Sequence, residues 1–204
     1  MTYPLRVFFI DGLILFSLYA IGLLGDCLCY GRPWTFYTLS NSYARAIVDN
    51  LVHGLISLFS TLFLFGSARK YLLLFALFAG SFVDIDHFIQ VRSLSLHRAL
   101  NDPSTQRPFL HNSLLLCCLT LIGFLIEHFL CKSEQYTYSI VFLLGWSTHH
   151  LRDAQRRGLT FRPLGETSPI EYYLPIMCLT LVLMKFVSIF SVQTSNRLRD
   201  SFNV

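Results

Sequence analysis

The sequence predicts an all-α protein, a multi-pass transmembrane helix bundle of about six spans. Two observations carry this prediction. First, the 204 residues are 53% hydrophobic and only 14% charged, whereas soluble domains carry about 25% charged residues. Second, the apolar residues form long blocks, and a block of about 18 apolar residues is long enough to cross a bilayer. Residues 1–204 are therefore expected to form a single integral membrane domain, with the lipid bilayer as its partner.

Each expected helix corresponds to one apolar block. The first block follows Arg6, contains Asp11 and lacks a small-residue cleavage site, so it is predicted to be a retained helix rather than a signal peptide. A basic turn at Arg69 and Lys70 separates the second block from the third, and the fifth block is short. A polar tail, residues 191–204, is expected to fray. The expected spans are about residues 7–29, 46–66, 71–88, 110–130, 138–151 and 170–190.

The long connections follow alternate spans, so a six-span bundle places them all on one side of the membrane. They comprise residues 30–45, 90–109 and 152–169. The net charge is +4, and most basic residues lie in short segments between the apolar blocks. Nucleic acid is not an expected partner, because its binding needs a clustered basic face. Contact with anionic lipid headgroups is expected instead, and no feature identifies a protein partner.

Acidic and imidazole side chains recur on the side of the long connections. A charged residue inside a span costs roughly 2.5–3.5 kcal/mol, so it persists where it is paired, hydrated or functional. Asp49 and His53 are four residues apart, as are His149 and Asp153, and residues at this spacing share a helix face. The polar residues at this level are Asp26, Asp49, His53, Asp84, Asp86, His87, His97, His111, His149, His150 and Asp153. Their recurrence predicts a metal site.

Imidazole and carboxylate ligands together suit Zn²⁺, Mn²⁺ or Fe²⁺ better than Ca²⁺ or Mg²⁺. The expected cofactor is therefore a divalent metal, zinc or manganese, and the number of ligands leaves a two-metal site open. Asp49 and Asp86 are candidates for the catalytic general base. On an ideal helix Asp86 points away from the other ligands, so it joins them only if the helix distorts near Ile85; otherwise it can support a ligating histidine. The expected metal ligands are His53, Asp84, His87, His111, His149 and Asp153.

Three segments carry a resemblance to a known family. An early histidine lies in Val52-His53-Gly54, residues 83–87 read VDIDH, and residues 145–153 read GWSTHHLRD, with a proline at 163. These segments resemble motifs of a family of membrane-bound metal-dependent hydrolases, typified by a LexA-regulated bacterial inner-membrane protein. The motifs of that family are an early His, a PDIDH-like segment, HRGxTHS, and GxxxHxxxD. The match to the last motif selects His149 over His150.

The third motif is only partly present. Residues 107–113 read RPFLHNS and align with its end, which supplies His111. Gln106 stands where the family has a histidine, so His97 could supply the imidazole after an insertion, or that ligand is absent. The resemblance covers about residues 49–164, and within the family the chain is most similar to the eukaryotic branch named transmembrane protein 267.

The resemblance implies a hydrolase that cleaves an ester or phosphoester with the help of a bound divalent metal. Because the site lies at the membrane interface, a lipid or other amphiphile is the expected substrate. Four arginines could bind a phosphate group or could anchor the chain at the interface: Arg152, Arg156, Arg157 and Arg162. The incomplete third motif favours an alternative, a non-catalytic membrane scaffold that keeps the fold. A transporter is disfavoured, because the polar residues cluster at one side and leave no path across the bilayer.

Overall fold

The computed structural model describes residues 5–31, 38–67, 69–103, 106–130 and 136–202. All regular elements in these residues are helical, which confirms the all-α prediction; outside the helices, isolated β-bridges occur around Thr160. The helices are α1 (Leu5–Tyr30), α2 (Ser42–Phe65), α3 (Lys70–Phe82), α4 (Ile85–Gln90), α5 (Leu96–Leu100), the 3₁₀ turn η1 (Phe109–His111), α6 (Ser113–Phe129), α7 (Thr137–Arg157) and α8 (Tyr173–Phe202).

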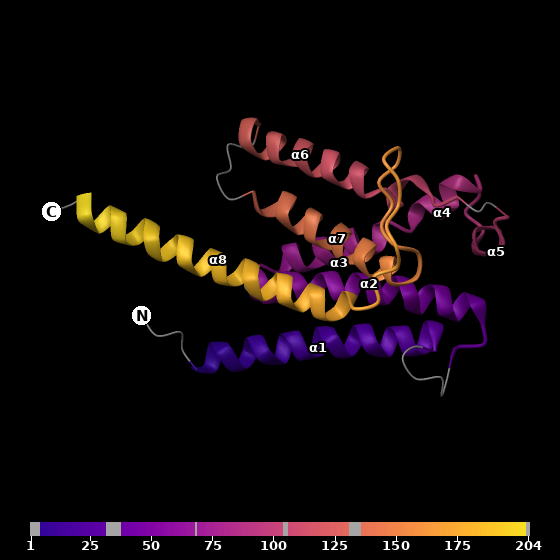
Figure 1. The fold of residues 1–204 in the computed structure, drawn as a ribbon, viewed down its shortest axis with the longest axis horizontal. Helices are drawn as coiled ribbons and strands as arrows, with labels where there is room; N and C mark the ends of the chain where they lie inside the picture. Colours follow the sequence, from indigo (N-terminus) through magenta and orange to yellow (C-terminus); the bar gives the residue numbers. More distant parts are fainter. Residues whose placement is uncertain (1–4, 32–37, 68, 104–105, 131–135, 203–204) are drawn as a thin grey trace.

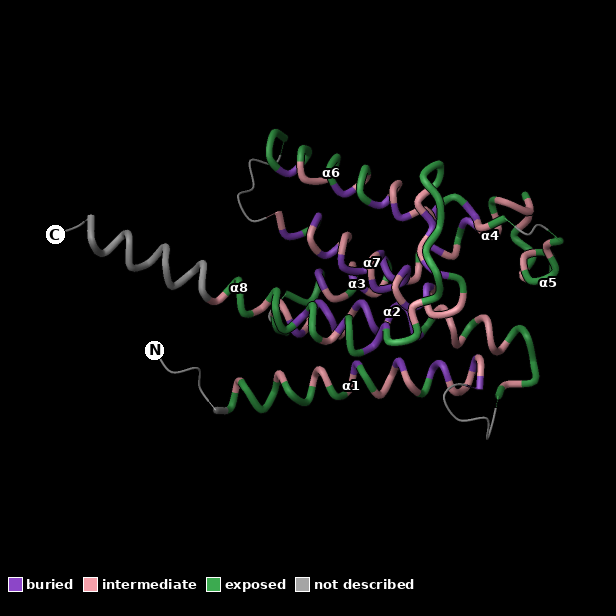
Figure 2. Tube along the Cα trace, in the orientation of Figure 1, coloured by how far each residue is buried: buried purple, intermediate pink, exposed green. Residues whose placement is uncertain are grey.

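The centre of the molecule is formed by α2, α3 and α7, which pack against one another (Figure 1). Helix α1 packs on α2, α6 on α7, and α8 on α7 and α2. Leu18, Ile56 and Leu174 meet in the largest apolar cluster, which joins α1, α2 and α8. Figure 2 shows that buried residues gather in the central helices, whereas α1 and α6 are exposed along most of their outer faces. The apolar core therefore holds the helix ends in place at the site described below.

Small residues let α2, α3 and α7 approach closely. A Cβ atom added to Gly80 would lie 2.7 Å from the carbonyl oxygen of His53 and 2.7 Å from the Cβ of Ser57. One added to Gly145 would lie 2.7 Å from the Oγ of Ser57, which itself donates to the Ala76 carbonyl at 2.6 Å. Small residues serve the same purpose at helix interfaces in membranes. This contact brings His53 of α2 beside the last turns of α3 and α7.

Gly80→Ala is expected to destabilise the protein by about 1–3 kcal/mol, because the added methyl group would push against a backbone oxygen that cannot rotate away. Gly12→Ala on α1 is the matched control, since nothing lies within 4 Å of its added Cβ. Denaturant unfolding of both variants in the same detergent measures the difference. Equal unfolding midpoints for Gly80→Ala and Gly12→Ala would show that the three helices are not closely packed here.

The described parts of the long connections lie at one end of the molecule. Figure 1 places α4, α5 and the connection between α7 and α8 at the right, while the beginning of α1 and the end of α8 lie at the left. Helix α3 ends at Phe82, so the expected span 71–88 is divided by a turn at Asp84. Residues 191–202 of the expected polar tail continue α8. These residues contain neither glycine nor proline, the strongest helix breakers.

Two helices are long and apolar enough to cross a membrane by length and composition, over Arg6–Tyr30 in α1 and Ser42–Phe65 in α2. Among the described residues, three further helices are apolar but shorter: Lys70–Phe82, Ser113–Phe129 and Tyr173–Ile189. By this criterion, two spans are identified where six were expected, and polar side chains explain part of this difference. They interrupt the apolar sequence at the site-facing end of α7 and in the turns that precede α4 and α6.

Candidate metal centre

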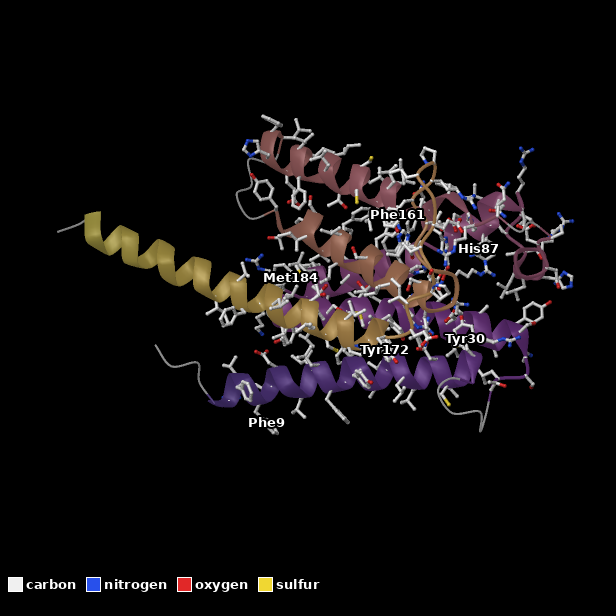
Figure 3. The ribbon with its side chains drawn as sticks, in the orientation of Figure 1. Phe9, Tyr30, His87, Phe161, Tyr172 and Met184 are labelled. Atoms are coloured by element: carbon white, nitrogen blue, oxygen red, sulfur yellow. The ribbon has the colours of Figure 1, made fainter. Side chains whose placement is uncertain are left out.

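The candidate site lies where α2, α3, α7 and η1 meet. His53 comes from α2, Asp84 from the turn that ends α3, His111 from η1, and His149 and Asp153 from α7. His53, His111 and His149 are buried, and the side chain of Asp84 is only 24% exposed. Figure 3 shows nitrogen and oxygen atoms gathered near His87 and Tyr30, at the same end of the bundle.

Pairs of these side chains approach to the distances expected of ligands that share an ion, within two groups that have His149 in common: His53, His149 and Asp153, and Asp84, His111 and His149. His111 Nε2 lies 3.5 Å from Asp84 Oδ1 and 3.3 Å from Asp153 Oδ2. His149 Nε2 lies 3.5 Å from Asp84 Oδ1, and His53 Nε2 lies 3.6 Å from Asp153 Oδ1. Two ligands about 2.1 Å from an ion at the tetrahedral angle are about 3.4 Å apart. These separations also exceed the roughly 2.7–2.9 Å of charge-assisted hydrogen bonds, so they match coordination better than ion pairing.

Two of the imidazoles are held so that their free nitrogens face each other. His149 Nδ1 lies 2.8 Å from the carbonyl oxygen of Gly80, which can only accept, so we assign the proton to Nδ1. His111 Nδ1 lies 3.1 Å from a carboxylate oxygen of Asp86, which assigns its proton in the same way. The two Nε2 atoms are 3.4 Å apart. Two lone pairs at this distance need a positive charge between them, either a proton on one Nε2 or a metal ion, and the donor set fits a divalent cation.

Asp86 lies behind His111 rather than among the ligands. Its side chain is fully buried, and its Oδ2 accepts hydrogen bonds from the Leu110 backbone N–H at 2.7 Å and from His111 Nδ1. The end of α3 at Phe82 makes this possible, because the following turn directs Asp84 and Asp86 toward opposite sides of the same imidazole. Of the two roles left open for Asp86, its placement suits support of a ligating histidine better than general-base catalysis.

The cluster stabilises positive charge at His111. Burial by itself lowers the pKa of this imidazole, yet the nearby carboxylates of Asp153, Asp84 and Asp86 outweigh burial and hold the pKa well above its ordinary value. Three carboxylates therefore surround one buried ring, and their negative charge favours a bound cation.

Asp49, the other candidate base, is engaged beneath the site. Its carboxylate accepts hydrogen bonds from Arg152 and from the Tyr30 hydroxyl. Arg152 is buried and also donates to Asp26 at 3.2 Å. Asp26 in turn accepts from the Tyr173 hydroxyl at 2.6 Å. Asp49 therefore belongs to an ion network that joins α1, α2, α7 and α8, and it also lines both cavities beside the cluster.

His87 lies at the edge of the cluster. Its Nε2 is 3.9 Å from Asp84 Oδ1, its side chain is 39% exposed, and its ring centre is 5.2 Å from that of His111. Asp86, His87 and His111 have donor atoms close enough for a second ion. The hydrogen bond between Asp86 and His111 already occupies one donor of each, so the geometry disfavours an ion bound by this group.

The structure does not bring the other singled-out histidines into the donor groups that the described residues form. His97 is exposed on α5, so it does not replace the missing imidazole, and Gln106 is exposed as well. His150 is buried, but its ring nitrogens meet the Ser113 hydroxyl at 3.0 Å and the Leu110 carbonyl at 2.9 Å. His150 therefore supports η1, and His149 is the residue that faces the cluster.

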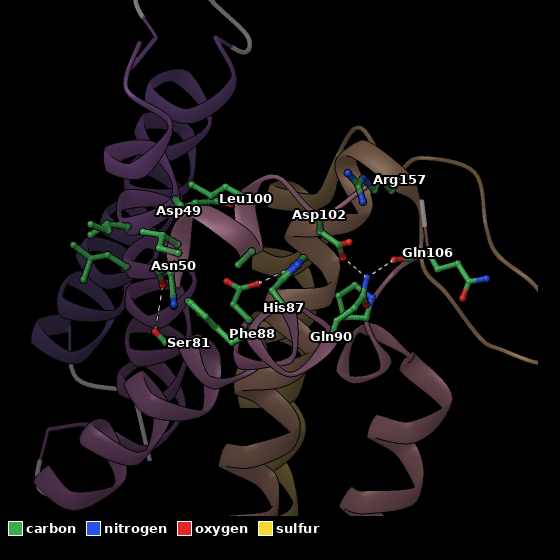
Figure 4. A pocket seen from close by; sticks show the side chains of 17 residues that line it. Asp49, Asn50, Ser81, His87, Phe88, Gln90, Leu100, Asp102, Gln106 and Arg157 are labelled. Atoms are coloured by element: carbon green, nitrogen blue, oxygen red, sulfur yellow. Dashed lines mark hydrogen bonds and ion pairs between the residues drawn. The ribbon is translucent and has the colours of Figure 1, made fainter. Parts of the chain in front are cut away.

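Two cavities adjoin the cluster and share residues. A polar cleft of about 120 Å³ reaches Asp84, His111 and Asp153. A larger pocket of about 670 Å³ also contains Asp84, together with His87 (Figure 4). The cleft is lined by three carboxylates, three guanidinium groups, two imidazoles and a proline: Asp49, Asp84, Asp153, Arg107, Arg156, Arg157, His87, His111 and Pro108.

The arginines differ in their availability. Arg152 is not free to bind phosphate, because Asp26 and Asp49 hold it inside the bundle. Arg162 is exposed, pairs with Glu166 and lies outside both cavities. Sequence reasoning gave no role to Arg107, which donates to the Gly158 carbonyl at 2.7 Å and to Thr160 at 3.2 Å and so fixes the end of α7. Its place just before His111 in the third motif was the available signal.

Asp86→Asn is expected to weaken metal binding by roughly 10–100-fold, the usual effect of losing a group that orients a ligating histidine. The amide cannot hold both the Leu110 N–H and the His111 ring with a negative charge. Competition with a chromophoric zinc chelator measures the affinity. Glu166→Gln, which alters an exposed pair with Arg162, should bind zinc as the wild type does. Equal affinity in Asp86→Asn would show that Asp86 does not position His111.

Comparisons with known proteins identify relatives that match about three quarters of the chain. No protein-family model matches the sequence, and no solved structure gives a significant match. Transmembrane protein 267 of Mus musculus is 38% identical over 156 residues, which cover 74% of this chain and 72% of the relative. The Danio rerio protein of that name is 34% identical over 76% and 71% of the two chains, and the Xenopus laevis protein is 30% identical over 77% and 74%.

The shared name of these relatives describes a membrane location and states no activity. The resemblance to metal-dependent hydrolases therefore rests on the sequence motifs and on the clustered side chains. Sequence identity over most of both chains does establish the relationship itself. The chain belongs to the transmembrane protein 267 family.

Proposed function

We propose that this protein is a multi-pass membrane hydrolase that holds one divalent metal ion at a membrane interface and cleaves an ester or phosphoester there. One observation carries the proposal: the Nε2 atoms of His111 and His149 face each other at 3.4 Å, with carboxylates of Asp84 and Asp153 around them. A purely structural polar cluster would pair these groups by hydrogen bonds, whereas their spacing suits a bound cation.

In this proposal α1, α2, α3, α6, α7 and α8 cross the membrane, and the cluster lies where their ends meet the headgroup region. Large apolar side chains on the outer faces support a lipid environment, because water would otherwise cover them. Phe16 on α1 is 71% exposed, Leu121 on α6 is 59% exposed and Leu179 on α8 is 61% exposed. Helix α3 is short because the chain turns at Asp84 to enter the site.

The chain's own residues take distinct roles. His53, Asp84, His111, His149 and Asp153 would hold the ion, with zinc or manganese as the metals that suit these donors. When bound, such an ion polarises the scissile group and makes water a stronger nucleophile at neutral pH. The Gly80 carbonyl orients His149, and Asp86 orients His111. His87 lies in both cavities, and we assign it to proton transfer on the substrate side.

A second candidate is a scaffold that keeps the metal for structure alone. Gln106 favours it, since this residue stands where the related motif has a histidine and no other described imidazole takes that place. Such a protein would bind metal without turnover.

The experiment that separates these readings uses purified full-length protein in detergent. The protein is stripped with a chelator, reloaded with zinc or manganese, and assayed for bound metal by mass spectrometry and for cleavage of carboxyl-ester and phosphoester substrates. The proposal expects one ion per chain and turnover that is lost in Asp153→Asn and kept in His97→Ala. Bound metal without cleavage of any ester would favour the metal-holding scaffold, and well-folded protein that binds no metal would exclude the hydrolase and leave a scaffold that keeps the fold without the metal.

A further inference from the structure

The two cavities at the cluster adjoin each other, the smaller one polar and the larger one lined in part by apolar side chains. They share the residues Asp49, Asp84, His87, Pro108 and Arg157. The larger pocket, about 670 Å³, has the size of a small-molecule site. Figure 4 shows the apolar side chains of Phe88 and Leu100 in the same pocket as His87 and Arg157.

The apolar wall continues onto a surface that a membrane would cover. Ile47 and Leu51 of α2 line the pocket and are at the same time 62% and 52% exposed. Leu96 and Leu100 of α5 form the facing wall. Because α2 is a candidate membrane span, an apolar chain could enter the pocket from the side, between α2 and α5, without passing through water.

The polar cleft favours a ligand group that carries negative charge. Three carboxylates and three guanidinium groups line the cleft, so their formal charges cancel, and a divalent ion leaves an excess of about two positive charges. Arg156 is engaged by Asp153 and Asp49, and Arg107 by backbone carbonyls. Arg157 is exposed and pairs with no acid in the part of the chain that the structure describes. Its planar guanidinium is therefore available for two-point binding of a phosphate.

From these features we infer that the site takes a single-chain amphiphile with a phosphate headgroup. The phosphate meets Arg157 beside the cluster, and the chain lies between α2 and α5. This inference rests on the proposed function for the reaction: water's oxygen bonds to phosphorus, the phosphorus–oxygen ester bond breaks, and the leaving oxygen takes up a proton. No other reactant is required.

Retention of ligands in native mass spectrometry tests the inference without any turnover. The zinc-treated full-length protein, released from detergent, is offered 1-myristoyl lysophosphatidate, 1-myristoylglycerol or glycerol 3-phosphate. Both halves of the amphiphile contribute, so lysophosphatidate should bind at least about tenfold more tightly than either of the others, a difference of roughly 1.4 kcal/mol. The uncharged lipid controls for the chain, and glycerol 3-phosphate controls for the phosphate.

Two variants separate the contributions of the polar and apolar ends. Arg157→Gln should reduce binding of lysophosphatidate to the level of the uncharged lipid, whereas Arg162→Gln, outside both cavities, should not. Ala99→Trp, which fills the pocket, should weaken binding of both lipids without changing that of glycerol 3-phosphate. Arg157 is exposed, so its substitution tests the inference even if the larger residue at position 99 impairs folding.

The outcomes distinguish this inference from the proposed function. Equal binding of the charged and uncharged lipids, or unchanged binding in Arg157→Gln, would overturn the inference. Equal binding of glycerol 3-phosphate and lysophosphatidate would overturn it in favour of a water-soluble phosphate. Selective lipid binding in a protein that cleaves no ester would contradict the proposed function and leave the inference standing. Cleavage of soluble esters without selective lipid binding would contradict the inference alone.

Discussion

His149→Ala is expected to abolish stoichiometric metal binding. His149 Nε2 belongs to two donor groups, one with His53 and Asp153 and the other with Asp84 and His111. Its loss therefore breaks both groups, and the affinity should fall by more than the roughly 10–100-fold that follows loss of a supporting hydrogen bond. Metal content by mass spectrometry, measured on detergent-purified protein beside Asp84→Ala, gives the result.

The control for this variant is His97→Ala. His97 is exposed on α5 and belongs to none of the donor groups found among the described residues, so its substitution should leave the metal content unchanged. The ring of His149 also stacks on that of His53, with centres 3.7 Å apart, so the unfolding temperature of each variant should be recorded. Metal retained at one ion per chain in folded His149→Ala protein would refute the assigned site.

Asp26→Ala is expected to destabilise the protein by about 3 kcal/mol or more, because removing one partner of a buried ion pair leaves the other charge without compensation. Asp26 and Arg152 are both almost fully buried. Arg152 Nε donates to Asp26 Oδ1, and Arg152 Nη2 lies 3.2 Å from the same oxygen. The Tyr173 hydroxyl loses its acceptor as well. Asp49 still binds Arg152, so the effect should lie at the lower end of the usual 3–5 kcal/mol.

Denaturant unfolding in a fixed detergent measures this effect. Arg162→Gln serves as the comparison, since its pair with Glu166 is exposed on both sides and such pairs contribute about 0–1 kcal/mol. Asp26→Ala should also weaken metal binding, because Arg152 precedes Asp153 and holds the end of α7 in place. A loss of less than about 1 kcal/mol in Asp26→Ala would show that this network does not anchor α1 to the bundle.

The residues of the candidate site could be predicted from the sequence because their positions follow the topology. A long connection follows every second apolar block, so polar residues that recur beside those connections are expected to meet at one end of the bundle. The structure brings His53, Asp84, His111, His149 and Asp153 together at that end. Helical spacing also placed His149 and Asp153 on one face, and both contribute to the same donor groups.

Spacing alone failed where a side chain had two possible partners. Asp49 shares a helix face with His53, yet its carboxylate binds Arg152 and Tyr30, which come from other helices. Arg152 was a candidate phosphate ligand, and the fold instead buries it against Asp26. A buried charge must be paired, and its partner is whichever group the helix packing places beside it. The spacing of residues along one helix does not show which residues of other helices lie nearby.

The helical architecture, the end of the bundle at which the polar residues gather and the chemical nature of the donors follow from the amino-acid sequence, because apolar block length and residue type are local properties. How those donors face one another depends on the packing of the helices. The turn after Phe82 sends Asp84 into the cluster and Asp86 behind His111. The close approach at Gly80 supplies the carbonyl that orients His149. Both depend on helix packing, in which distances of a few tenths of an ångström decide whether two nitrogens can share an ion.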